Sequence, residues 1–119
     1  PDMHEPYAHE LIALADDIAK EKNIKVQHGI YLGDMGPAFE TPAEYRMYRI
    51  LGADAVGMST VPEVLVARHC GIKVFGMSII TDLGGFDVPV AVSHEEVQIA
   101  ANEAQPRMTE IMREMIRRS

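Results

Sequence analysis

The chain has 119 residues, of which 47% are hydrophobic and 24% are charged. This balance is typical of a small globular domain and excludes a disordered, collagen-like or coiled-coil chain. The formal net charge of −7 argues against nucleic-acid binding through a broad basic surface, because such a chain repels phosphate backbones.

Helical and extended patterns alternate along the chain, which predicts an α/β domain. Residues 7–22 form an amphipathic helix in this prediction, because apolar residues recur there with the helical period. A strand over residues 24–32 follows. It leads into a loop over residues 33–40, where glycine and proline interrupt regular structure.

Three later helix starts carry the capping-box pattern, a threonine or serine followed three residues later by glutamate. They begin at Thr41, Thr60 and Ser93. We expect the first two helices to end at Gly52 and Gly71, and the second to be largely buried because it is apolar on most sides. A buried strand over residues 53–58, a strand over residues 73–81 and a loop over residues 82–92 complete the predicted order.

Ligands of open α/β sheets bind where strands end and helices begin. The sequence has three such junctions, at residues 36–41, at residues 57–60, and at Thr81–Asp82 before the loop that leads to His94. At the second junction, the Ser59 hydroxyl and nearby backbone N–H groups can bind phosphate at a helix N-terminus. The alternative is that Ser59 or Thr60 only caps the helix.

The other two junctions carry carboxylates and a histidine. Glu40 follows Phe39, and a carboxylate beside an aromatic ring can hold the polar edge of a planar base; otherwise it is an exposed loop acid. Asp82, at the end of a strand, has the same two interpretations, and His94 at a helix start is either a neutral ligand or a surface histidine. The remaining histidines show no metal-ligand spacing; they are His4, His9, His28 and His69.

Cysteine content and hydropathy indicate the setting. The single cysteine, Cys70, excludes an internal disulfide and a zinc site of several thiolates, and we expect it to be buried and inert. No apolar stretch is long enough to span a bilayer and no signal-peptide pattern opens the chain, so we expect a cytoplasmic protein without a membrane partner. Because the chain starts at Pro1 without an initiator methionine, we expect it to be a portion of a longer protein.

The three junctions resemble the trimeric purine nucleoside phosphorylases. The run Gly36–Glu44 (GPAFETPAE) is similar to the G-P-x-F-E-T-x-A-E segment of that family, and so is Leu51–Val64 (LGADAVGMSTVPEV). The similarity continues through Val66–Gly71 and the helix start His94–Val97, and it covers essentially the whole chain. It implies that residues 1–119 are the C-terminal part of a single phosphorylase domain, an incomplete α/β domain with a mixed sheet and flanking helices.

The resemblance implies an enzyme that performs phosphorolysis of purine nucleosides. Inorganic phosphate, the co-substrate, displaces the base from ribose to give ribose 1-phosphate, with no metal or organic cofactor. The sugar becomes positively charged and the purine gathers negative charge, so a catalyst must hold phosphate near the sugar and stabilise the departing base. The family assembles as homotrimers and carries most phosphate ligands in its N-terminal portion. An inactive fragment is therefore the alternative for this chain.

Residue roles follow from the resemblance alone. It implies that Ser59 binds phosphate, that Met58 packs beneath the ribose, and that His94 meets the ribose 5′-hydroxyl. Phe39 and Val56 would line the base pocket. Catalytic contacts to the substrate are then expected from three residues: Glu40, Asp82 and His94.

Two acidic residues indicate opposite substituents at position 6 of the purine base. Glu40 would accept a hydrogen bond from the N1–H of a 6-oxopurine, as in inosine or guanosine. Asp82 stands where the 6-oxopurine enzymes commonly carry asparagine; an amide can donate to purine N7, whereas an ionised carboxylate only accepts and favours a 6-amino group. Either Asp82 is protonated in a dry pocket, or the specificity extends to 6-aminopurines such as methylthioadenosine. We favour 6-oxopurine nucleosides as substrates.

A competing class is a small binding or signalling module of flavodoxin or receiver type. The alternating pattern and the acidic residues near strand ends favour it. It would require a suitable lysine late in the chain, which the sequence lacks, and it does not explain the long central similarity to the phosphorylases.

Overall fold

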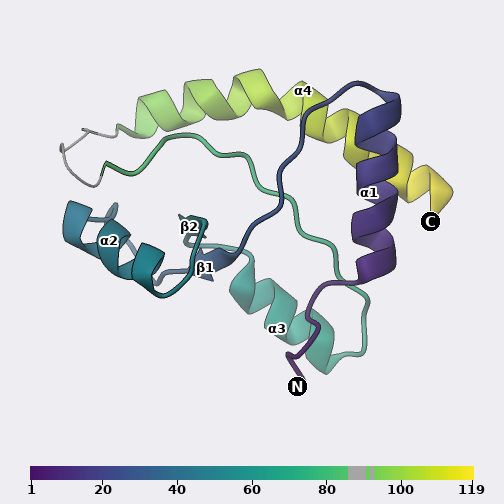
Figure 1. The fold of residues 1–119 in the computed structure, drawn as a ribbon, viewed down its shortest axis with the longest axis horizontal. Coiled ribbons are helices and arrows are strands. Elements are labelled where there is room, and N and C mark those ends of the chain that lie inside the picture. Colours follow the sequence, from purple (N-terminus) through teal and green to yellow (C-terminus); the bar gives the residue numbers. More distant parts are fainter. Residues whose placement is uncertain (86–90, 92) are drawn as a thin grey trace.

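A computed structural model describes residues 1–85, 91 and 93–119. The described part contains the helices α1 (His9–Glu21), α2 (Pro42–Ile50), α3 (Val61–His69) and α4 (His94–Arg118), and the strands β1 (Tyr31–Gly33) and β2 (Ala55–Gly57). Figure 1 shows α1 crossing the C-terminal part of α4 on one side of the molecule, while α2, α3 and the two strands lie on the other side. Across these residues, no helix is both long and apolar enough to cross a membrane.

The two strands pair in parallel, with α2 in the connection between them. Their register places Leu32 opposite Val56 and Gly33 opposite Gly57. The pairing extends by one bond at the end of β1, where the N–H of Asp34 donates to the carbonyl of Gly57 at 2.8 Å. This β–α–β unit confirms the α/β expectation and brings the chain segments that follow β1 and β2 to the same edge.

The strand predictions were too long. Each strand spans three residues rather than the nine and six expected, and residues 73–81 form no strand in the structure. The physical reason is that a strand exists only where a neighbour accepts and donates ladder hydrogen bonds. Apolar patterning indicates that a segment can be buried, but it does not supply the partner strand.

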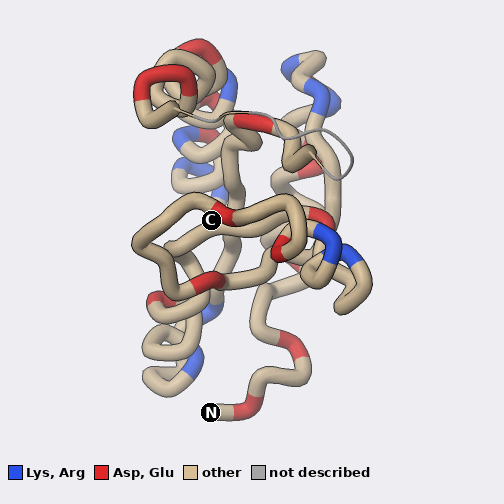
Figure 2. The backbone as a smooth tube through the Cα atoms, turned by 90° about the vertical axis from the view of Figure 1, so that its left-hand side faces the viewer, with Lys and Arg blue, Asp and Glu red and all other residues tan. Residues whose placement is uncertain are grey.

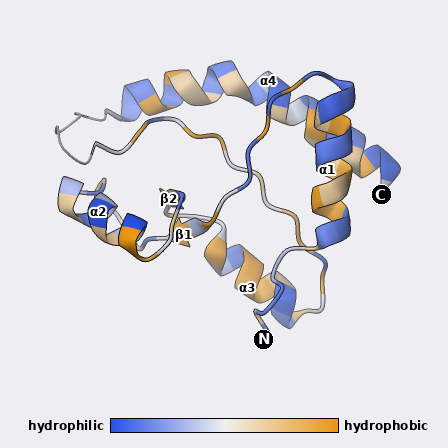
Figure 3. Ribbon diagram, viewed as in Figure 1, coloured by the Kyte–Doolittle hydropathy of each residue, from blue (hydrophilic) through white to orange (hydrophobic). Residues whose placement is uncertain are grey.

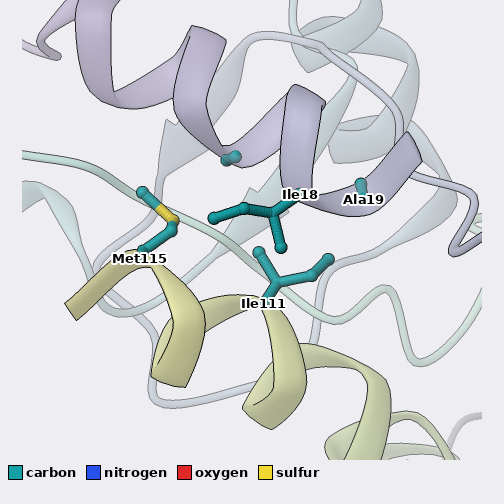
Figure 4. Packing of buried hydrophobic residues seen from close by; sticks show 5 residues of the cluster. Ile18, Ala19, Ile111 and Met115 are labelled. Carbon is teal, nitrogen blue, oxygen red and sulfur yellow. The ribbon is translucent and has the colours of Figure 1, made fainter. Parts of the chain in front are cut away.

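The core lies between α1 and α4. Ile18 of α1 and Ile111 of α4 are fully buried, and Figure 4 shows them pointing toward each other, with Ala19 and Met115 beside them. The hydropathy colouring of Figure 3 places apolar positions of both helices at this crossing. Phe75 and Met77 pack against the same cluster, and the N–H of Ala8 donates to the carbonyl of Val74 at 2.8 Å.

Ion pairs join the outer ends of α1 and α4. Arg118 donates to Glu21 of α1 at 2.6 Å and to Glu114 of its own helix at 2.7 Å. Hydrogen bonds from Arg117 and Arg118 hold the pKa of the half-buried Glu114 carboxyl at about 2. Figure 2 shows acidic and basic positions interspersed along the backbone, as the composition suggests.

All three predicted capping sequences mark a helix start, and two of them form the expected side-chain hydrogen bonds. The Thr41 hydroxyl accepts from the N–H of Glu44 at 3.2 Å, and Ser93 and Glu96 form the reciprocal pair of bonds. Thr60 occupies the predicted N-cap position of α3, but the predicted capping hydrogen bond is wrong, because its side chain makes none.

The burial predicted for α3 and for Cys70 was also wrong. Val64 is the buried residue of α3, whereas Val66 is 64% exposed, and Cys70 is exposed. The helix packs on β1, where a Cβ on Gly33 would lie 2.8 Å from Val61. A two-stranded sheet can cover only one side of a helix, so an apolar sequence on most sides leaves the other side in solvent.

Candidate functional site

A hollow of about 350 Å³ lies at the edge where β2 ends. It is lined by Tyr31 of β1, by residues 55–60 from β2 and the following turn, and by residues 77–81. Three predicted site residues, Val56, Met58 and Ser59, are therefore brought together here. Thr81, the residue before Asp82, lines the same hollow.

The turn at the rim of this hollow has an unusual backbone. Thr60 has φ 74° and ψ −59°, and the N–H of Val61 donates to the carbonyl of Ser59 at 2.8 Å. This is a γ-turn of the rare kind, which is strained for a residue with a side chain. It places the Ser59 and Thr60 hydroxyls 3.3 Å apart at the N-terminus of α3, where the helix dipole favours an anion.

A second group of side chains forms around Tyr45 of α2. The Tyr45 hydroxyl donates to Oε2 of Glu40 at 3.1 Å. Burial, the charge and hydrogen bond of Glu40, and the charge of Asp82 raise the pKa of Tyr45 to about 12. A Cβ on Gly84 would lie 2.8 Å from the Tyr45 ring. Glu40 and the segment that carries Asp82 therefore meet at this tyrosine.

A second tyrosine of α2, Tyr48, holds the start of the loop over residues 34–41, which connects β1 to α2. The Tyr48 hydroxyl donates to Oδ2 of Asp34 at 3.0 Å, and the N–H of Met35 donates to Oδ1 of the same residue at 2.6 Å. Burial, together with the hydrogen bond and charge of Asp34, raises the pKa of Tyr48. The loop over residues 34–41 is thus held to α2 near both of its ends.

The loop also touches the hollow. Gly36 has φ 63°, and a Cβ built on it would lie 2.6 Å from the sulfur of Met58. The backbone before Phe39 and Glu40 is therefore packed directly on a residue that lines the hollow. Through this contact the two groups of predicted residues form one continuous region.

The remaining predicted residues lie at its margin. Phe39 is 49% exposed and is not among the residues that line the hollow. Asp82 is exposed, and its Oδ1 accepts a hydrogen bond from the Thr81 hydroxyl at 2.9 Å. His94 is the first residue of α4 and is exposed. It is not a lining residue either, and the connection to it passes through residues 86–90 and 92, outside the described part.

The sequence interpretation missed Tyr31 and Tyr45, and it named Thr81 only as part of a junction. A usable signal existed for Tyr45, because residues just before an N-cap commonly contact the fourth helical position, as in a hydrophobic staple. With Thr41 as the N-cap, Glu40 and Tyr45 occupy those two positions. Here a carboxylate and a phenol replace the usual apolar pair.

Comparison with known proteins identifies the family. A sequence model of the phosphorylase superfamily matches residues 1–117. The chain belongs to the phosphorylase superfamily. This confirms the resemblance noted in the sequence and rules against the flavodoxin or receiver alternative.

Relatives of this superfamily chain are purine nucleoside phosphorylases. Purine nucleoside phosphorylase 1 of Geobacillus stearothermophilus is 50% identical over 97 residues, which are 82% of this chain and 35% of that protein. Purine nucleoside phosphorylase 1 of Bacillus subtilis (strain 168) is 41% identical over 116 residues, which are 98% of this chain and 43% of that protein. The chain thus spans less than half the length of these relatives.

Solved structures give the same result for the fold. The purine nucleoside phosphorylase of Schistosoma mansoni in complex with inosine matches with a TM-score of 0.92 and 39% identity, covering 98% of this chain and 42% of that one. The same enzyme in complex with adenosine matches with a TM-score of 0.90 and 37% identity, covering 98% and 43%. The chain therefore has part of the purine nucleoside phosphorylase fold.

Proposed function

We propose that the complete protein containing this chain is a purine nucleoside phosphorylase. It transfers the ribosyl or deoxyribosyl group of 6-oxopurine nucleosides, such as inosine and guanosine, to phosphate. The products are the free base and ribose or deoxyribose 1-phosphate. Residues 1–119 supply the C-terminal part of its single domain. The observation that carries this proposal is the contact of the Glu40 loop with Met58 beside the hollow, in a chain whose relatives have that name.

The sugar and phosphate are assigned to the hollow. Ser59 binds phosphate with its hydroxyl, supported by the neighbouring Thr60 hydroxyl at 3.3 Å and the N-terminus of α3. Met58 packs beneath the ribose, and His94 contacts the ribose 5′-hydroxyl. Phosphate held near the sugar stabilises the positive charge that develops as the bond to the base breaks.

The base is assigned to the neighbouring loop. Phe39 and Val56 line its faces and Glu40 accepts its N1–H. The hydrogen bond from Tyr45 occupies one carboxylate oxygen of Glu40, which leaves the other oxygen for the base. Asp82 faces the N7 side, where the departing purine gathers negative charge.

Asp82 favours a second candidate, a phosphorylase that accepts 6-aminopurine nucleosides, including methylthioadenosine. Its carboxyl group is exposed and accepts a hydrogen bond from the Thr81 hydroxyl. An acceptor at this place suits the amino group of adenine better than the oxygen of hypoxanthine.

Assembly and setting are part of the same proposal. We expect a homotrimer in the cytoplasm that uses inorganic phosphate as co-substrate, needs no other cofactor, and binds neither nucleic acid nor membranes. The apolar side chains that α2 and α3 expose, among them Ile50 at 85% and Val66 at 64%, are consistent with further protein packing against this face. Light scattering of the purified protein measures the assembly.

The test is turnover by the complete protein. Inosine, guanosine, adenosine and methylthioadenosine are each incubated with and without phosphate, and the free base and the sugar phosphate are measured by chromatography. Phosphate-dependent release of hypoxanthine and guanine is expected. Exclusive use of methylthioadenosine would overturn the preferred substrate class.

The same test on residues 1–119 alone addresses the inactive fragment. Phosphate with hypoxanthine should raise its melting temperature only if this part of the site binds both ligands by itself. No shift, together with activity of the complete protein, would show that the remaining phosphate ligands lie elsewhere in the polypeptide.

A further inference from the structure

We propose that Tyr45 is a positioning residue that holds the Glu40 carboxylate in the orientation that recognises the purine, and so contributes to the choice of base. This inference rests on the proposed function. Tyr45 itself touches Glu40 rather than the substrate. It is therefore separate from the residues assigned to the substrate above.

The geometry fixes Glu40 from two sides. Its neighbour Thr41 caps α2 through the 3.2 Å bond from the N–H of Glu44, which ties the backbone to the helix. One turn later, Tyr45 donates to Oε2 of Glu40 at 3.1 Å, which ties the side chain to the same helix. A glutamate has three rotatable side-chain bonds, and holding it in one orientation otherwise costs conformational entropy when the base binds.

The Tyr45 phenol stays protonated and can therefore donate its hydrogen bond to Glu40 at physiological pH. Because burial and the nearby charges of Glu40 and Asp82 raise the pKa of Tyr45 to about 12, the hydroxyl keeps its proton throughout the physiological range. The bond is charge-assisted on the acceptor side, which strengthens it and narrows its geometry. With Oε2 occupied, Oε1 is the oxygen left to accept a ring N–H.

The ring of Tyr45 also positions the opposite side of the region. Gly84, two residues after Asp82, approaches the ring so closely that an added Cβ would lie 2.8 to 3.0 Å from three of its atoms. One aromatic side chain therefore sets the spacing between the Glu40 loop and the Asp82 segment. A shift of this ring would alter both carboxylates together.

The test uses Tyr45→Phe in the complete protein, with Tyr48→Phe as the matched control. Both variants lose one hydroxyl from the same face of α2, but Tyr48 donates to Asp34 and not to Glu40. The readouts are kcat and KM for inosine, and the inhibition constants of hypoxanthine and adenine. Hypoxanthine offers an N1–H to Glu40, whereas adenine N1 is an acceptor.

Tyr45→Phe is expected to lower kcat/KM for inosine about tenfold, the size of effect that a hydrogen bond to a charged group provides. It should weaken hypoxanthine binding about tenfold and adenine binding less than twofold. Tyr48→Phe should change the inhibition constants of hypoxanthine and adenine by the same factor. In a Glu40→Gln background the effect of Tyr45→Phe should disappear, because the two residues act as one unit.

The inference would be overturned if Tyr45→Phe weakened the binding of hypoxanthine and adenine equally. It would also be overturned if Tyr45→Phe had an undiminished effect in the Glu40→Gln background. If Tyr45→Phe is poorly folded, Tyr45→His offers a ring N–H in place of the phenol and should restore part of the preference for hypoxanthine; no restoration in a folded protein counts against the proposal. Failure of the proposed function is recognised separately, because the unmodified protein would then release no hypoxanthine from inosine.

Discussion

Gly36→Ala is predicted to damage the site more than the fold. Gly36 has φ 63°, a left-handed conformation that costs a residue with a Cβ about 1 to 2 kcal/mol. The new Cβ would also lie 2.6 Å from the Met58 sulfur. Because that sulfur belongs to a flexible side chain, we expect Met58 to move rather than the loop. The proposed seat of the ribose then changes shape.

Gly71→Ala is the matched control for this substitution. Gly71 has φ 72°, and a Cβ on it would meet nothing within 4 Å, so it carries the same backbone cost without a steric contact. Both variants should lose about 1 to 2 kcal/mol in urea unfolding. Only Gly36→Ala should raise KM for inosine, by about three- to tenfold. If Gly71→Ala raises KM equally, backbone strain alone explains the effect and the contact with Met58 has no functional role.

Three further predictions concern stability, pH and base preference. Ile111→Ala should lower the free energy of unfolding by about 2 to 5 kcal/mol, because Ile111 is 1% exposed. Ile116→Ala on the same helix should lower it by less than about 0.5 kcal/mol, because Ile116 is 73% exposed. Equal losses in urea unfolding would contradict the placement of the core. Since the folded-state pKa of Glu114 is about 2, below its ordinary value of 4.5, its ion pair stabilises the fold above that ordinary value and is lost as the pH falls toward 2. Glu114→Gln should therefore melt earlier than the unmodified protein at pH 7 and at the same temperature near pH 2, and a gap that persists in acid would refute the linkage. Glu40→Gln should reduce the ratio of inosine to adenosine turnover by more than Asp82→Asn changes it, and the reverse order would make Asp82 the main determinant of specificity.

The helices were predictable because their signals are local. The apolar period located α1 within two residues of its start, and the Thr41 and Ser93 caps located α2 and α4. The strands were not, because a ladder depends on a partner far away in sequence. Residues 73–81 carry a strand-like pattern without forming a strand in the structure.

The failures at the site share a physical cause. Thr60 follows the capping-box pattern, yet its backbone adopts a γ-turn with φ 74°, a conformation that local propensity disfavours and that surrounding structure must impose. Tyr45 was overlooked because no local sequence pattern singles out its hydroxyl. The role of its hydroxyl depends on the hydrogen bond to Glu40, five positions earlier, which only the structure shows. Sequence patterns thus located the junctions, whereas the contacts between junctions required coordinates.

Burial explains why Glu40, rather than Asp82, should decide the base. Glu40 is half-buried and already holds one donor, so a base that offers no N–H leaves its second oxygen desolvated and unpaired, which is costly. Asp82 is exposed and accepts from a side-chain hydroxyl, so water can satisfy its other oxygen whichever base is present. A fixed, partly desolvated acceptor discriminates more strongly than a hydrated one. We therefore expect the Glu40–Tyr45 pair to favour 6-oxopurines even though a carboxylate stands at position 82.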